Sequence, residues 1–352
     1  MRTYKNLFPQ IWEFGNLYAA WRKARRGKRY TLAAAAFEQN LDVELVALQQ
    51  ELANETYQPG PYRSFTVHEQ KRRRISAAPF RDRVAHHALC NIIEPIYERK
   101  FIDDSFANRV GKGTHRALDR CTFFMRRYPY VLQCDVRQFF PAIDHTVLKA
   151  ILARTIADSP TLRLCDKIID SGAGVLSDEY EMHYFPGDDL LAATRPRGLP
   201  IGNLTSQFWG NVYLNPLDQF VKHELRCPAY LRYVDDFLLF GSDKVALHRW
   251  RDQIIGFLQS LRLTIHAKRA HPCPVGHGIS FLGFVVFPDH RRLKRSRGIG
   301  YRRHLYALYE QYRRGEIDRQ PLDASIRAWV GHAMHGDTWR LREKLFQPLA
   351  LA

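Results

Sequence analysis

The stretch LRYVDDFLLF at residues 231–240 places two adjacent aspartates between apolar segments that are typical of buried strands. Neighbouring carboxylates repel each other, and burying either one without a partner is costly. Asp-Asp is also a common turn dipeptide, so one interpretation is a hairpin tip exposed to water. That interpretation explains the turn but not the length of apolar strand on both sides. We therefore predict a hairpin that presents Asp235 and Asp236 as oxygen ligands to a metal ion.

A third carboxylate comes from YPYVLQCDVRQFFPAIDH at residues 128–145, where Asp135 ends another apolar run. Three carboxylates at strand ends of one sheet can hold two divalent cations. Such ions activate an attacking hydroxyl and neutralise a leaving phosphate, and magnesium suits a site of carboxylates and substrate phosphates. The pattern predicts nucleotidyl transfer.

Two other acidic pairs lack this setting. Asp103-Asp104 follows a predicted helix and has no strand on both sides. Asp188-Asp189 lies in FPGDDLL, next to a proline-glycine turn, and we predict an exposed turn there.

The charge of the chain favours a polyanionic partner. Lys and Arg total 53 against 36 Asp and Glu, a net charge of +17. The basic residues gather at 22–29, 71–76 and 291–303. Any one of these clusters could be a solvated face, but three clusters around one apolar middle fit a groove that follows a phosphate backbone.

Apolar periodicity predicts helices at residues 7–21 and 79–101, a helix that ends near Gly315, and another that starts near Asp323. The acidic, poorly patterned segment 177–196 is expected to be a surface loop. No apolar run approaches the length of a membrane span, and the N-terminus lacks the core of a signal peptide. We expect a cytoplasmic protein with no membrane contact.

Taken in order, four segments resemble the reverse transcriptase family. They are Asp135 followed by Phe139-Phe140, RGLPIGNLTSQ at 197–207, YVDD at 233–236 and FLGF at 281–284. The resemblance implies an α+β, right-hand polymerase fold with fingers, an antiparallel palm and a short helical thumb. Fingers and palm would occupy residues 59–288 and a basic thumb residues 289–352, after a basic helical N-terminal extension at residues 1–58.

One departure from the common family pattern points to a subgroup. Most members carry glutamine and proline where this chain has Ile201 and Gln207, a feature similar to the reverse transcriptases of diversity-generating retroelements. That resemblance implies error-prone cDNA synthesis with misincorporation opposite template adenines. It also implies a structured template RNA, an RNA/cDNA duplex and a small, basic, helical, oligomeric accessory protein as partners. We expect no separate nuclease domain after the palm.

The resemblance assigns the metal ligands and a general acid. Asp135, Asp235, Asp236 and the backbone carbonyl of Val136 would bind two Mg²⁺ ions, with Mn²⁺ as an alternative metal. Lys268 would protonate the leaving pyrophosphate, with a lysine on a solvated turn as an equal alternative.

Substrate contacts follow from the same resemblance. Phe139, or its neighbour Phe140, would exclude a 2′-hydroxyl so that dNTPs are preferred over NTPs; core packing is the alternative for either ring. The other predicted dNTP contacts are Arg74, Arg81, Arg109, Ile201 and Gly202. The predicted template and primer contacts are Asn108, Gln207, Phe281, Leu282 and Gly283. The register of the fingers arginines is open by a residue or two, and the segment around Gly283 could equally be palm core.

Two alternative functions stay open. The chain could be another bacterial reverse transcriptase, such as a retron, group II intron-like or antiphage defence enzyme. It could also be an RNA-binding scaffold that has lost catalysis, although all three aspartates are present.

Overall fold

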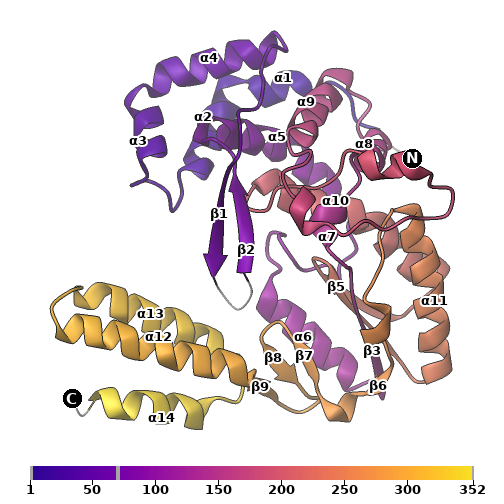
Figure 1. Ribbon diagram of the computed structural model, residues 1–352, viewed down its shortest axis with the longest axis vertical. Coiled ribbons are helices and arrows are strands. Elements are labelled where there is room, and N and C mark those ends of the chain that lie inside the picture. Colours follow the sequence, from indigo (N-terminus) through magenta and orange to yellow (C-terminus); the bar gives the residue numbers. More distant parts are fainter. Residues whose placement is uncertain (1–2, 69–71, 351–352) are drawn as a thin grey trace.

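The computed structural model describes residues 3–68 and 72–350 and combines helices with antiparallel sheets (Figure 1). The strands are β1 (Arg63–His68), β2 (Arg72–Ala77), β3 (Tyr130–Asp135), β4 (Ala229–Tyr233), β5 (Asp236–Gly241), β6 (Cys273–Pro274), β7 (Ile279–Phe281), β8 (Phe284–Val286) and β9 (Arg291–Leu293). The helices are α1 (Phe8–Trp12), α2 (Phe14–Ala24), α3 (Leu32–Gln39), α4 (Leu41–Ala53), α5 (Phe80–Glu98), α6 (Thr114–Met125), α7 (Phe139–Ala142), α8 (His145–Ala153), α9 (Ser159–Asp170), α10 (Leu204–Gln219), α11 (Lys244–Ser260), α12 (Arg295–Arg313), α13 (Arg319–Ala333) and α14 (Trp339–Ala350). The predicted α+β class is confirmed.

A four-stranded sheet with the order β4-β5-β3-β6 forms the centre of the chain. All its described pairings are antiparallel, and β5 lies between β4 and β3. The register places Asp135 opposite Asp236, which brings together carboxylates 101 positions apart in the numbering. The two apolar runs of the sequence therefore become neighbouring strands.

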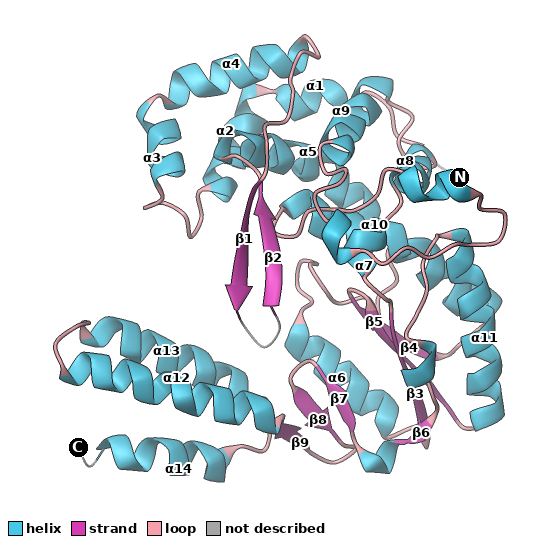
Figure 2. Cartoon of the chain, in the orientation of Figure 1, coloured by secondary structure: helices cyan, strands magenta, loops and turns pink. Residues whose placement is uncertain are grey.

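Both faces of this sheet are buried, which explains why its strands are continuously apolar instead of alternating with polar residues. Side chains on one face pack with α5, α10 and α11, and on β4 and β5 these are Tyr230, Phe237 and Leu239. The alternate side chains pack with α6 and the small sheet of β7 to β9, and these are Leu231, Leu238 and Phe240. Figure 2 shows the central strands between these groups of helices.

The N-terminal helices α1 to α4 gather around α5, and the β1–β2 hairpin extends away from them (Figure 1). The helix predicted at residues 7–21 is broken into α1 and α2, because Glu13 leaves the helical region with φ −52° and ψ 132°. Asn16 fixes this corner by donating to the carbonyl oxygens of Ile11 and Ala88. The helix predicted at 79–101 is α5.

The C-terminal helices α12 to α14 lie beside the β7–β9 sheet (Figure 1). Helix α12 ends at Arg313, close to the predicted end at Gly315. Helix α13 begins at Arg319 and not near Asp323, so that prediction was wrong. The reason is that Pro321 lies in the first turn, where its missing N–H costs nothing, so the helix extends upstream of it.

The segment 177–196 contains the short 3₁₀ turns Ser177–Glu179 and Leu190–Thr194. The exposed turn predicted beside Asp188-Asp189 is present at Pro186 and Gly187, and Asp189 is exposed, but the Asp188 side chain is only 3% exposed, so the prediction was wrong for Asp188. Its carboxylate pairs with Arg195 and, at 2.7 Å, with Arg262. Throughout the part of the chain that the structure describes, every helix is too short or too polar to cross a membrane.

Candidate active site

The β4–β5 hairpin presents the two adjacent aspartates at its turn. Tyr233 pairs with Asp236, which leaves Val234 and Asp235 as the turn residues. Val234 has a φ of 58°, a left-handed conformation that is strained for a β-branched side chain. The backbone N–H of Val136 donates to the Asp235 carbonyl at 3.2 Å and ties this turn to the segment that follows Asp135.

A fully buried ion pair connects strand β4 of the hairpin to helix α10. Arg232 Nη2 lies 2.6 Å from Asp218 Oδ2 on α10, and both side chains are 0% exposed. Arg232 Nη1 also donates to the carbonyl of Val234 at 2.8 Å, so the charged pair fixes the strained residue directly. Tyr230 Oη donates to Asp218 and completes the network. No sequence motif marked this pair, because its two residues lie on different elements.

Asp135 and Asp236 face each other across β3 and β5. The Asp135 side chain is 51% exposed, and its carboxylate lies 4.0 Å from His266 Nε2. The Gln133 side-chain amide donates to both carboxylate oxygens of Asp236, at 3.1 and 3.2 Å. Within the described residues, no three His, Cys, Asp or Glu side chains already converge in a ligand cluster. Backbone register thus brings the three aspartates to one place, while their side chains keep separate contacts.

The electrostatics at this sheet edge favour a cation. Burial raises the pKa of Asp236 to about 7, against the opposing effect of the hydrogen bond from Gln133. The negative charges of Asp135 and Asp235 raise that pKa further. Burial is the main cause of this raised pKa and repulsion by the two other carboxylates a smaller one, and a bound divalent cation would oppose both by stabilising the ionised form.

This raised pKa predicts a pH-dependent stability of the metal-free protein. Because the folded-state pKa of Asp236 lies above the unfolded value near 4, the folded state binds more protons between about pH 4 and pH 7. The contribution of Asp236 to the free energy of unfolding should therefore fall as pH rises through that window. Denaturant unfolding in EDTA, compared between wild type and Asp236→Asn, checks this. A difference between the two proteins that stays constant with pH would contradict it.

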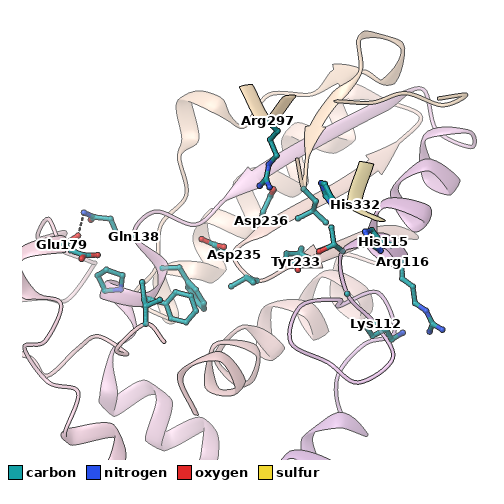
Figure 3. Close-up of a pocket in the computed structure, with 18 residues that line it drawn as sticks. Lys112, His115, Arg116, Gln138, Glu179, Tyr233, Asp235, Asp236, Arg297 and His332 are labelled. Atoms are coloured by element: carbon teal, nitrogen blue, oxygen red, sulfur yellow. Dashed lines mark hydrogen bonds between the residues drawn. The ribbon is translucent and has the colours of Figure 1, made fainter. Parts of the chain in front are cut away.

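The hairpin opens onto a cleft of about 1200 Å³. Figure 3 shows Asp235 and Asp236 between Gln138 and Glu179 on one side and Arg297, His115 and His332 on the other. The basic side chains that line the cleft come from the start of α6 and from the C-terminal helices, and they are Lys112, His115, Arg116, Arg297 and His332. The sequence analysis placed Arg297 in the basic cluster at 291–303 but missed the other four as cleft residues. For Lys112, His115 and Arg116 the available signal was the polar stretch GKGTHR at 111–116.

Phe139 and Phe140 both line the cleft, with ring centroids 5.1 Å apart. Phe139 is 2% exposed and Phe140 is half-buried. Gly210 of α10 makes room for the pair, since a Cβ there would lie 3.2 Å from Phe139 Cε1. The structure therefore brings both candidate rings to the cleft, and the choice between them stays a prediction.

Ile201 lines the cleft beside these rings, at a turn attached to β2. Its carbonyl accepts from Ser76 N at 2.8 Å. Gly202 has a φ of 112°, and a Cβ there would lie 2.7 Å from Ile75 Cγ2, so this position requires glycine. The Asn203 side chain bonds Ala78 N, Ser76 O and Pro200 O, which fixes the turn to the end of the β1–β2 hairpin.

Leu282 and Gly283 form the two-residue turn between β7 and β8, both with positive φ. This is the φ pattern of the tight hairpin turns that match strand twist. Leu282 lines the cleft, whereas the flanking Phe281 is 1% exposed and belongs to the core. The hairpin thus has a core side and a cleft side. Lys294 N donates to the Gly283 carbonyl, which attaches the turn to the start of α12.

The arginines predicted to contact dNTP have other partners here. Arg74 pairs with Asp178 at 3.3 Å, and Arg81 pairs with Glu51 of α4 at 2.8 Å. Arg109 is 6% exposed, pairs with Glu98 at 2.9 Å and donates to two loop carbonyls. None of the three lines the cleft within the described residues.

The remaining predicted contacts also lie off the cleft. Asn108 has a φ of 53° in the loop before α6, and the exposed Gln207 lies in the first turn of α10. Lys268 is exposed in the short turn Ala267–Arg269. The roles of these residues stay predictions. In the basic cluster at 71–76, Lys71 lies outside the described residues.

Residues 63–286 match the family described as reverse transcriptase (RNA-dependent DNA polymerase). The chain belongs to the reverse transcriptase family. The match extends from β1 to β8, so the central sheet, the aspartate hairpin and the turn at Ile201 all fall within it. The right-hand polymerase fold implied by the sequence follows from this membership.

Two curated relatives of this reverse transcriptase are similar over different lengths. Protein YkfC of Escherichia coli strain K12 is 26% identical over 284 residues, covering 69% of this chain and 71% of YkfC. The group II intron-encoded protein LtrA of Lactococcus lactis subsp. cremoris is 28% identical over 176 residues, covering 49% of this chain and 27% of LtrA. A solved apo telomerase from Candida tropicalis has a TM-score of 0.45 at 12% identity, over 67% of this chain and 49% of that one.

Proposed function

We propose that this reverse transcriptase is a catalytically competent RNA-directed DNA polymerase. The observation that carries the proposal is that the strand register places Asp135, Asp235 and Asp236 at one end of the central sheet, where Asp235 and Asp236 line a cleft that Lys112, Arg116 and Arg297 also line. A cleft lined by both carboxylates and cationic side chains suits a metal-assisted reaction on a polyphosphate. The competing scaffold function would not need this arrangement.

The donor set fits a divalent cation, because it consists of carboxylate and carbonyl oxygens, the hard ligands that such ions prefer. Asp135, Asp235, Asp236 and the Val136 carbonyl would hold Mg²⁺, with Mn²⁺ as an alternative. The bound ions would polarise the primer hydroxyl and stabilise charge on the leaving pyrophosphate. Gln133 holds Asp236 in place in the metal-free site. Arg232 keeps the Val234 turn in its strained conformation. The buried core therefore fixes the direction in which the neighbouring Asp235 side chain points.

Other cleft residues would select and orient substrate. One of the rings of Phe139 and Phe140 would close the space beneath the sugar and exclude a 2′-hydroxyl. Leu282 would contact the primer strand from the β7–β8 turn. Arg297 would attract the phosphates of a nucleic acid by its charge, whereas His332, whose pKa is lowered by burial, would offer a neutral ring for hydrogen bonding. Arg74 and Arg81, in exposed or half-exposed pairs, would have to exchange their carboxylate partners to reach a triphosphate.

The proposed activity is tested by primer extension. Purified protein, a DNA primer on an RNA template with all four bases, dNTPs and MgCl₂ should give DNA product, and EDTA should abolish it. NTPs in place of dNTPs should give much less product. If no product forms when a structured native RNA and a candidate accessory protein are also supplied, the scaffold function is favoured.

We also propose that the enzyme is of the diversity-generating retroelement type, producing error-prone cDNA from a template RNA with an oligomeric accessory protein. Support comes from Ile201 and Gln207, which depart from the common family pattern, and from the position of Ile201 on the cleft wall. The similarity to LtrA supports a group II intron-like enzyme as the alternative. The two proposals differ in fidelity.

Replacing Ile201 by glutamine should lower misincorporation opposite template adenine by several-fold. An apolar side chain offers only a shape contact to the nascent base pair, whereas glutamine adds hydrogen bonds that discriminate more strongly. Sequencing of primer-extension products measures the change, with Ile201→Val as a control that keeps the apolar contact. Equal error spectra for all three proteins would remove Ile201 as the source of infidelity, and an accurate wild type would favour the group II intron-like alternative.

A further inference from the structure

A second, smaller pocket lies outside the cleft, where α2 and the loop after it meet α5 and the start of α10. Its volume is about 140 Å³. Five side chains that can carry positive charge line it, and these are Lys23, Arg26, Lys28, Arg83 and His87. Its remaining polar wall comes from His86 and from the backbone at Gly202–Leu204. Because Ile201 lines the cleft and Gly202 lines this pocket, one turn separates the two spaces.

The positive charge in this pocket is only partly offset: Lys23 Nζ donates to Asn91 Oδ1, and the charge of Lys23 opposes the burial that raises the pKa of Glu94. No carboxylate lines it, and among the described residues no ion pair involves Lys23, Lys28 or Arg83. Burial lowers the pKa of Lys28, and the charge of Arg83 lowers it further. Burial also lowers the pKa of His87 to about 4, with Lys23 among the cations that add to the effect. Cations that destabilise one another across an empty space favour an anion between them.

Arg83 is positioned for such a role. Its Nε donates to the carbonyl of Ala78 at 2.9 Å, which fixes the guanidinium plane. Within the described residues no other acceptor engages it, so its terminal N–H groups stay available. A fixed guanidinium with free N–H groups is well suited to a phosphate.

A buried imidazole without a partner lies in the same wall. His86 is 1% exposed, and neither of its ring nitrogens has a hydrogen-bond partner. Burial lowers its pKa to about 3, so the ring is neutral and one ring nitrogen carries a proton that it can donate. Buried polar groups are nearly always satisfied in proteins, so this donor in the wall of a pocket is available to hydrogen-bond a ligand.

The start of α10 adds to this environment. Asn203 is the N-cap residue, but its side chain bonds Ala78, Ser76 and Pro200 and makes no capping hydrogen bond. The first amide groups of a 16-residue helix are therefore left without a side-chain cap beside the pocket. Uncapped helix N-termini carry partial positive charge and favour phosphate groups.

We propose that this pocket is a binding site for a phosphate group, separate from the catalytic cleft. The phosphate could belong to the backbone of an RNA strand that passes over the turn at Ile201, or to a free nucleotide. Lys23, Lys28 and Arg83 would supply the charge, and His86 would donate a hydrogen bond. The proposal concerns binding alone, so it is independent of whether the cleft catalyses polymerisation.

The test compares Lys28→Gln and Lys23→Gln with Arg29→Gln, which removes the same charge from the same exposed segment but does not line the pocket. One arm titrates inorganic phosphate and ATP by calorimetry. The other measures binding of a labelled single-stranded RNA by fluorescence anisotropy over a series of salt concentrations. Thermal unfolding of each variant verifies that it is folded. Two pocket variants are used so that the test remains possible if one of them does not fold.

If the pocket binds phosphate, Lys28→Gln should weaken binding in at least one arm by about tenfold, which is the effect of losing one charge-assisted contact. If the ligand is a backbone phosphate of RNA, Lys28→Gln should also lower the slope of log affinity against log salt concentration by about one. Weaker phosphate and ATP binding with an unchanged RNA slope would identify a free nucleotide as the ligand. If both pocket variants match Arg29→Gln in both arms, the proposal is overturned, whatever the outcome of primer extension.

Discussion

Replacing Asp235 by asparagine is expected to reduce primer extension on an RNA template by at least about a thousandfold. The substitution keeps the shape of the side chain but removes the charge that would hold a divalent cation at the hairpin turn. Asp235 is a turn residue whose direction is set by the strained Val234, so no neighbouring carboxylate can take its place without moving the backbone. The loss should appear in the rate of the chemical step, while RNA binding stays close to that of wild type.

The chain offers a matched control for this experiment. Asp189 also belongs to an Asp-Asp pair, but it is exposed and does not line the cleft. Asp189→Asn should therefore extend primers at the wild-type rate. If Asp235→Asn keeps more than a small fraction of wild-type activity while EDTA still abolishes it, the metal ligands lie elsewhere in the cleft.

Replacing Arg232 by methionine should lower the free energy of unfolding by about 3–5 kcal/mol. The substitution leaves Asp218 buried at 0% exposure without its cationic partner, and a buried unpaired carboxylate is far more costly than the pair itself. It also removes the hydrogen bond from Arg232 Nη1 to the carbonyl of Val234. The stability loss should therefore be accompanied by a loss of polymerase activity.

Denaturant unfolding of single and double variants checks the origin of this effect. The double variant Arg232→Met, Asp218→Leu should recover most of the lost stability, because it removes both charges from the core. Arg163→Met breaks an exposed pair with Glu55 and should change stability little. If the double variant is as unstable as the single one, packing around Arg232 and not the orphaned charge of Asp218 causes the loss.

The central sheet and its aspartates were predictable because their signals are local. Strands buried on both faces read as continuous apolar runs, so β3 and β5 stand out in the sequence. A polar residue at the end of such a run is conspicuous, which is how Asp135, Asp235 and Asp236 were found. Their pairing across the sheet needed only the antiparallel register.

Contacts between distant segments were not predictable in the same way. Asp188 sits in a turn-forming context, yet Arg262, on the far side of α10 in sequence, pairs with it and removes it from water. The resemblance to reverse transcriptases assigned Arg81 and Arg109 to the dNTP, but glutamates on α4 and α5 pair with them. Ion-pair partners depend on tertiary packing, and tertiary packing between charged residues produces no periodic pattern in the amino-acid sequence. The absence of a hydrogen-bond partner for the His86 ring could not be predicted from the sequence either.

The two-faced burial of the central sheet also bears on how the chain is made. Helix α6 precedes β5, but the β7–β9 sheet that completes the cover over Leu238 and Phe240 comes after it. During synthesis from the N-terminus, the sheet face that carries Leu238 and Phe240 is therefore only partly covered for roughly several seconds, until residues 279–293 have been added. Such a nascent chain exposes apolar surface to which chaperones and other ribosome-bound copies can bind. Slow translation or a stop before Ile279 should favour aggregates over soluble fragments.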